Sequence, residues 1–147
     1  MSIASAFASH HQTCDDAYAE AELAASEGRW PDAVAAFERF RALTERHLAV
    51  EEERLFPAFE SVTGIVSGPT RVMRIEHRQL RALFDQMADA ARNRSPDDFG
   101  GAGETMLMMM QQHNLKEENV LYPMCERALQ SDPKLALELT AALQGPP

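Results

Sequence analysis

The sequence predicts an all-α protein: an up-down-up-down four-helix bundle with an internal two-fold repeat and a short C-terminal tail helix. Apolar residues recur at helical spacing along most of the chain, and no segment shows the alternation typical of a strand. The sequence also repeats with an offset of 66 residues, which fits a doubled helical hairpin better than a solenoid. We expect one domain over residues 1–147, with halves of about 1–66 and 67–132 and a tail over 132–147.

The first half is expected to form two helices, over about residues 3–27 and 31–60. Gly28 is a natural helix stop, and Pro31 suits the first turn of the next helix. Pro57 lacks an N–H group and should kink or end that helix. The inward stripe of the first helix repeats in steps of three and four: Phe7, His11, Cys14, Tyr18, Ala21 and Ala25.

The second half is expected to follow a loop over residues 62–69 and to begin with a helix over 70–93. Its stripe is the first stripe shifted by 66 positions: Met73, His77, Leu80, Phe84, Met87 and Ala91. Ser95 is a plausible cap for the fourth helix. Gly100, Gly101 and Gly103 weaken its first turns, so its solid part should span 104–129. Asp132 and Pro133 then begin the tail helix.

Composition excludes several classes of protein. The net charge of −9 argues against a general nucleic-acid or anionic-membrane surface. No apolar run approaches the roughly 18 residues needed to span a bilayer. The first ten residues lack the basic region of a secretory signal, and two cysteines form no disulfide framework, so we expect a cytoplasmic protein.

One template occurs twice, at residues 47–60 and 113–126: H-x-x-x-E-E-x-x-L-(aromatic)-P-x-x-E. Residues i and i+4 lie on one face of a helix, so His47 and Glu51 can point into one cavity, as can His113 and Glu117. A third pair, His11 and His77, obeys the same offset of 66 and lies on the inward stripes.

These side chains together predict a metal centre. The candidate ligands are His11, His47, Glu51, His77, His113 and Glu117. A lone His on an apolar stripe is more often a hydrogen-bonded core residue, but burying four imidazoles and two carboxylates without a cation would be costly. Imidazole suits Fe, Zn, Cu and Ni, and carboxylates can bridge two ions. Water, oxide or a small diatomic molecule would fill the remaining positions.

Two assignments keep an alternative. His10 precedes His11, but only His11 has a histidine as its repeat mate. Glu118 could bind in place of Glu117 if the helix bulges locally. Spacing favours Glu51 and Glu117, which leaves Glu52, Glu53 and Glu118 as a solvated face or as groups behind the ligands.

The chain resembles the hemerythrin-like (HHE cation-binding) proteins over roughly residues 5 to 129. The motifs that carry the resemblance are His11 in His-Gln-Thr-Cys-Asp, His47-x-x-x-Glu51-Glu52, Glu76-His77-Arg and His113-Asn-Leu-Lys-Glu117-Glu118. The resemblance implies a four-helix bundle with a non-haem di-iron centre and bridging carboxylates. A single ion, or a different divalent metal, is the alternative.

The sequence departs from the oxygen-carrying members at one position. Those proteins place a further His four residues before the third-helix His, where this chain has Met73, with Phe7 as its repeat mate. One iron therefore lacks a nitrogen ligand, and water, Glu76 or an open position takes its place. Reversible oxygen carriage becomes less secure, and a reactive or sensory role is favoured.

Two functions follow from the resemblance. The first is a non-enzymatic module that binds or senses oxygen, nitric oxide or iron. The second is a di-iron oxidoreductase or an iron–sulfur-cluster repair factor. No base, nucleophile or organic-cofactor motif supports a defined reaction, which favours the first, and the sequence names no protein partner.

Overall fold

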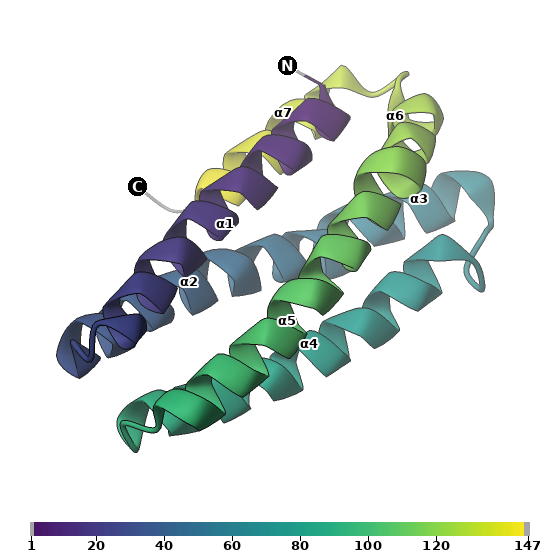
Figure 1. Ribbon diagram of the computed structural model, residues 1–147. Helices are drawn as coiled ribbons and strands as arrows, with labels where there is room; N and C mark the ends of the chain where they lie inside the picture. The colour runs from purple at the N-terminus through teal and green to yellow at the C-terminus, as the bar shows by residue number, and fades with distance from the viewer. Residues whose placement is uncertain (1, 146–147) are drawn as a thin grey trace.

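The computed structural model describes residues 2–145, and it confirms the predicted bundle of four long antiparallel helices with a short C-terminal helix (Figure 1). No strand occurs within these residues. Two of the long helices are each interrupted by one π-helical turn, η1 and η2. The elements are α1 (Ile3–Ser26), α2 (Trp30–Val50), η1 (Glu51–Leu55), α3 (Phe56–Thr63), α4 (Pro69–Arg92), α5 (Pro96–Lys116), η2 (Glu117–Leu121), α6 (Tyr122–Leu129) and α7 (Pro133–Gln144).

The internal repeat predicted from the sequence is present in the structure. Helices α1 and α4 have 24 residues each, α2 and α5 have 21, and α3 and α6 have eight. Each element of the second half begins 66 positions after its mate, as Ile3 and Pro69 do. Helix α1 packs against α2 and α5, and α4 packs against the same two helices, so the halves enclose a common core.

The helix ends follow local sequence signals. The Ser95 hydroxyl accepts a hydrogen bond from the backbone N–H of Asp98, and the Asp132 carboxylate accepts one from Leu135. Gly28 follows α1 with φ +72°, a conformation that a residue with a Cβ atom rarely adopts. The predicted stop, the predicted cap and the start of the tail helix are therefore confirmed.

Pro57 does not end the second long helix, which was one of the two effects expected of it, a kink or an end. The chain stays helical to Thr63 because a π-helical turn precedes the proline. In this wider turn the N–H of Phe56 bonds the carbonyl of Glu51, five residues earlier. The same turn precedes Pro123 in the second half. Each copy of the template therefore contains a π turn that begins at its first Glu, Glu51 or Glu117.

A buried polar layer divides the core into two apolar clusters. One cluster lies between the α1–α2 turn and the middle of the bundle and includes Phe37, Phe40 and Phe84. The other lies at the opposite end and includes Phe7 and Phe56. Helix α7 closes this second end, because Leu139 and Leu143 are buried there in the same cluster.

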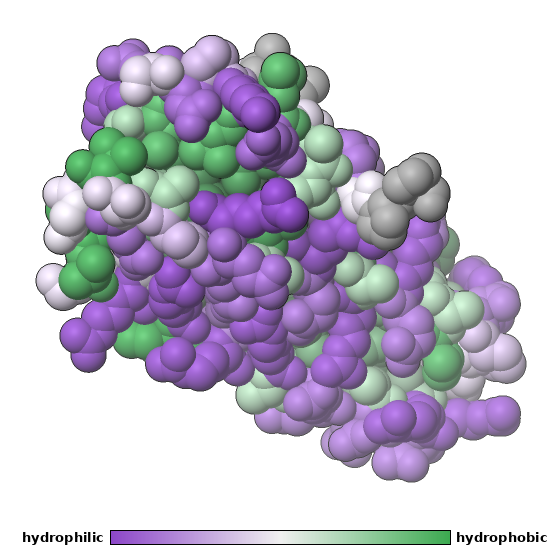
Figure 2. Space-filling view, turned by 180° about the vertical axis from the view of Figure 1, so that it is seen from behind, coloured by the Kyte–Doolittle hydropathy of each residue, from purple (hydrophilic) through white to green (hydrophobic). Residues whose placement is uncertain are grey.

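The outer surface is mostly hydrophilic, and apolar side chains gather toward the end of the bundle that carries α3 and α6 (Figure 2). Val62 and Val66, near the end of α3 and in the following loop, are among the exposed apolar residues. Over residues 2–145, every helix is too short or too polar to cross a bilayer.

The glycine-rich start of α5 is fully helical from Pro96, although weak turns were expected there. Gly103 is buried at a close approach of helices: an added Cβ would lie 2.6 Å from Tyr18 Oη and 3.2 Å from Met87 Cε. Gly101 faces solvent, and an added Cβ there would meet nothing within 4 Å.

Alanine substitutions at these two glycines should have opposite effects on stability. Gly101→Ala should raise the free energy of unfolding by about 0.5–1 kcal/mol, because alanine favours the helix without a clash. Gly103→Ala should lower it, because overpacking costs about 1–3 kcal/mol and exceeds the gain in propensity. Urea unfolding of the two variants measures the difference, and equal shifts in the same direction would contradict the packing described here.

Candidate metal centre

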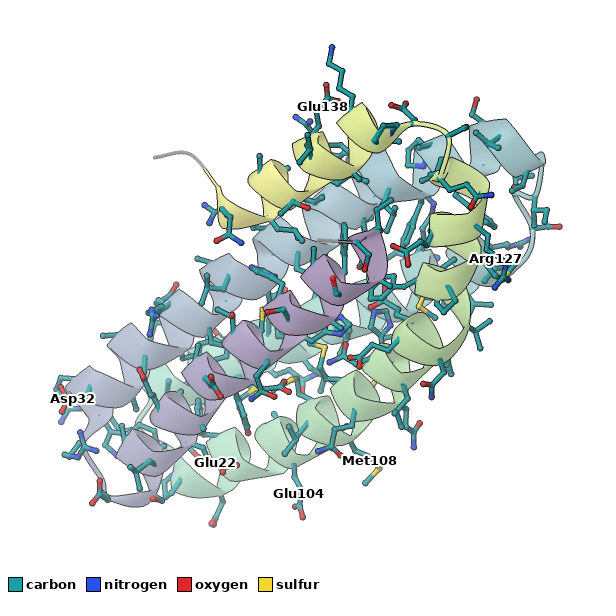
Figure 3. All side chains as sticks on the ribbon, turned by 90° about the horizontal axis from the view of Figure 1, so that it is seen from above. Glu22, Asp32, Glu104, Met108, Arg127 and Glu138 are labelled. Carbon is teal, nitrogen blue, oxygen red and sulfur yellow. The ribbon has the colours of Figure 1, made fainter. Side chains whose placement is uncertain are left out.

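The six predicted ligands meet in the polar layer at the middle of the bundle. His11 is 6% exposed and the other five are at most 2% exposed. They come from four segments: α1 supplies His11, α4 supplies His77, and each copy of the template supplies one His and one Glu. Charged side chains such as Glu104 and Arg127 point away from the bundle (Figure 3), whereas these six are buried.

The six side chains form two clusters that share Glu117. In the first cluster, one ligand atom each from Glu51, His77, His113 and Glu117 lie within 4.8 Å of one another. His77 Nε2 is 3.2 Å from Glu51 Oε1, and His113 Nε2 is 3.2 Å from Glu117 Oε1. Each carboxylate of this cluster therefore lies directly beside one of its two imidazoles.

The second cluster contains His11, His47 and Glu117. His11 Nε2 lies 3.1 Å from Glu117 Oε1, and His47 Nε2 lies 3.4 Å from Glu51 Oε2. Both carboxylates thus reach imidazoles of both clusters.

Three of the four imidazoles are held from behind by a carboxylate. The outer Nδ1 atoms contact Glu118 at 2.7 Å from His11, Glu52 at 2.7 Å from His77, and Glu76 at 2.9 Å from His113. A carboxylate only accepts, so each Nδ1 carries a hydrogen and each Nε2 points inward, where the neutral form of the ring would present a lone pair. These contacts therefore fix the orientation of three rings, with Nε2 facing the interior.

Basic residues hold two of these outer carboxylates. Arg81 donates two hydrogen bonds to Glu52, at 2.8 and 3.0 Å, and Lys116 donates one to Glu76 at 2.5 Å. Burial works against ionisation of Glu52, but His77 and Arg81 outweigh it and lower its pKa to about 2. Burial also opposes ionisation of Glu76, but Lys116 and His113 outweigh it and lower its pKa, so these two carboxylates are charged at neutral pH.

The fourth imidazole has a different partner. His47 Nδ1 lies 2.9 Å from His10 Nδ1, and the two rings stack at 10°. Burial and the neighbouring His47 lower the pKa of His10 to about 4, so His10 is neutral. His10 occupies the repeat position of Glu76, as His47 occupies that of His113. One outer carboxylate of the symmetric pattern is thus replaced by a neutral ring.

The centre contains buried polar atoms that no hydrogen bond satisfies within residues 2–145. They include Glu51 Oε1, Glu117 Oε2, His77 Nε2 and His113 Nε2, all in the first cluster. Such atoms are rare in folded proteins and cost about 1–3 kcal/mol each. A cation bound between them would satisfy all four, so the residues present fit a metal ion.

Protons and a metal ion would compete for the imidazoles of this centre. Burial favours the neutral imidazole, but Glu117 outweighs it and raises the pKa of His113 to about 9. The pKa values of His11 and His77 are also raised, by Glu117 and Glu51 respectively against the effect of burial. Without a metal, protons on these rings balance the carboxylates, and a cation would displace them.

The structure shows where the residues lie that the sequence-based prediction kept as alternative ligands. Glu118 contacts the outer nitrogen of His11 and is not in the cluster, although the local bulge that would have favoured it is present. His10 lies behind His47. Glu76 contacts His113 and Lys116. The residue at the missing-His position, Met73, is buried in the apolar cluster.

Sequence reasoning missed Tyr122, whose hydroxyl lies at the middle of the site. Tyr122 Oη is 2.6 Å from Glu51 Oε2, 3.0 Å from Glu117 Oε1, 3.0 Å from His47 Nε2 and 3.2 Å from His11 Nε2. Burial and the charges of Glu117 and Glu51 raise its pKa well above the ordinary value. The sequence contained a signal for this residue: the aromatic position of the template is Phe56 in one copy and Tyr122 in the other, so only one copy carries a hydroxyl.

A small cavity of about 10 Å³ adjoins the second cluster. Three of the imidazoles reach it, and its other walls are mainly apolar. The residues that line it include His11, His47, His113, Phe40, Leu48 and Met110. A space of about 10–15 Å³ holds one water molecule, so the cavity suits a ligand of similar size.

The fold and the centre define a helical-bundle, cation-binding domain. The sequence model of the hemerythrin HHE cation binding domain matches residues 2–125, which leaves α7 outside the match. The chain therefore belongs to the hemerythrin HHE cation-binding family. Searches of curated proteins and of solved structures gave no match.

The stability of the metal-free protein should depend on pH through His113. Its folded-state pKa of about 9 lies above the unfolded value of 6.5, so the protonated ring stabilises the fold fully below pH 6.5. That stabilisation should be lost as the pH rises from 6.5 to 9. Urea unfolding of metal-free protein at several pH values measures the loss. His113→Gln should flatten the curve in this window, and an unchanged curve would contradict the assignment.

Proposed function

We propose that this protein binds two iron ions in the polar layer and uses them to capture or sense a small diatomic molecule, oxygen or nitric oxide. His77 and His113 would hold one ion, His11 and His47 the other, and Glu51 and Glu117 would bridge them. Iron would supply reversible binding or redox chemistry toward the diatomic ligand. The observation that carries the proposal is the convergence of four inward imidazoles on two buried carboxylates with unpaired atoms.

The donor set supports iron but allows other metals. Four imidazole nitrogens and two carboxylates suit Fe, and they also suit Zn and other first-row ions, whose occupancy depends on availability. Two nitrogens for each ion leave positions for an external ligand. The missing nitrogen at Met73 increases the number of such positions on the His77–His113 side.

The cavity beside the second cluster supports a small ligand. Its volume of about 10 Å³ excludes an organic substrate, and its walls combine apolar Phe40, Leu48 and Met110 with the polar Asp15 and Asn114. Thr44 also lines it, and the Thr44 hydroxyl has no hydrogen-bond partner among the described residues. A compact molecule in this cavity would lie beside three imidazoles, those of His11, His47 and His113.

Metal content should follow the two-cluster geometry. Protein grown with iron should contain about two irons per chain, one for each cluster. Glu117→Ala should lose most of both, because Glu117 belongs to both clusters, whereas His47→Ala should retain about one. Glu53→Ala, a change at an exposed neighbour on the same turn, is the matched control. Elemental analysis measures the iron, and unchanged content in the first two variants would contradict the ligand set.

Ligand capture should depend on the cavity. Anaerobic Fe(II) protein should change its visible spectrum on exposure to nitric oxide or oxygen, in stopped-flow measurements. Thr44→Ile adds bulk to the cavity and should slow the change, whereas the isosteric Thr44→Val should not. Equal rates in both variants would contradict entry through this cavity. A stable, reversible spectrum supports capture, and catalytic loss of the oxidant would instead support the oxidoreductase alternative.

A further inference from the structure

The hydroxyl of Tyr122 has more close polar neighbours than a phenol can satisfy. Two carboxylate oxygens and two imidazole nitrogens lie 2.6–3.2 Å from it. A phenol has one hydrogen to donate, and the shortest contact, to Glu51, uses it. Glu117 Oε1, 3.0 Å away, can only accept a hydrogen bond, so its lone pair faces a phenol lone pair, and the two repel unless a cation lies between them.

The distances are those between ligands of one metal ion. Metal–nitrogen and metal–oxygen bonds of about 2.0–2.2 Å place neighbouring ligands about 3 Å apart. His11 Nε2, Glu117 Oε1 and Tyr122 Oη are separated by 3.0–3.2 Å, and Tyr122 Oη lies 3.0 Å from His47 Nε2. The phenol oxygen thus lies where a further ligand of the second cluster would lie.

The internal repeat separates the role of the ring from that of the hydroxyl. Phe56, the repeat mate of Tyr122, stacks on His77 with centroids 5.8 Å apart and an angle of 27°. Tyr122 stacks on His11 at 5.7 Å and 29°. The ring therefore packs alike in both halves, and packing needs no hydroxyl. Only the second copy of the template adds a hydroxyl oxygen to this ring.

The charges behind the imidazoles also distinguish the second cluster from the first. The imidazoles of the first cluster are backed by two carboxylates, Glu52 and Glu76. Those of the second cluster are backed by one carboxylate, Glu118, and by neutral His10. A phenolate at Tyr122 would supply the missing negative charge.

We propose that Tyr122 Oη is a further metal ligand, bound to the ion that His11 and His47 hold. The inference rests on the proposed function, since it requires a metal in the second cluster. When the ion binds, the phenol releases its proton to water and the oxygen keeps the electron pair for the metal–oxygen bond. The two metal positions are then chemically unequal, one with a phenolate and one beside the apolar ring of Phe56.

The test uses the full-length protein loaded with iron and oxidised to Fe(III), because a phenolate bound to Fe(III) gives a broad visible absorption and enhances tyrosinate ring vibrations in resonance Raman spectra. The chain has two tyrosines. Tyr122→Phe copies the residue of the other half and should abolish both signals while most of the iron stays bound. Tyr18→Phe, in the apolar cluster away from the polar layer, should leave them unchanged.

Isotopic labelling gives a second measurement that needs no variant. Unmutated protein made with ring-deuterated tyrosine should show shifted Raman modes. Wild-type protein with two irons and no tyrosinate modes, or modes that persist in Tyr122→Phe, would overturn this inference alone. Wild-type protein that binds no iron would overturn the proposed function as well, and elemental analysis of the same samples distinguishes the two outcomes.

Discussion

The structure depends on placing four imidazoles and two carboxylates in a desolvated layer between two apolar clusters. Burial of an unpaired charge costs several kcal/mol even after the protein relaxes. The outer contacts to Glu52, Glu76 and Glu118 satisfy one nitrogen of each of three rings, but the inward atoms of the first cluster keep no partner within residues 2–145. A cation bound between these atoms would resolve this conflict, because the charges it needs are already in position.

The two π turns determine which side chains of the template reach this polar layer. Each turn begins at a Glu, Glu51 or Glu117, and precedes a Pro, whose ring would clash with the preceding turn of a regular helix. The wider turn moves the following residues around the helix. Tyr122, five residues after Glu117, consequently shares its face and reaches its carboxylate. In a regular helix of 3.6 residues per turn, a residue five positions on would point elsewhere.

Much of the fold and the centre could be predicted from the sequence. The repeat of the template and the inward position of His11 and His77 were sufficient to select the six residues that the structure brings together, because i and i+4 spacing holds up to Glu51 and Glu117. Tyr122 was missed because α-helical spacing fails directly after these residues. The role of His10 was also hidden, since its contact with His47 depends on how α1 and α2 pack. Neither side-chain arrangement can be read from spacing along one helix.

The most direct test of this account is an X-ray anomalous difference map collected at the iron absorption edge from crystals of iron-loaded protein. The account predicts two peaks in the polar layer, one among Glu51, His77, His113 and Glu117 and one among His11, His47 and Glu117. An iron-loaded crystal with no peak in this layer, or with iron bound only at the surface, would contradict it.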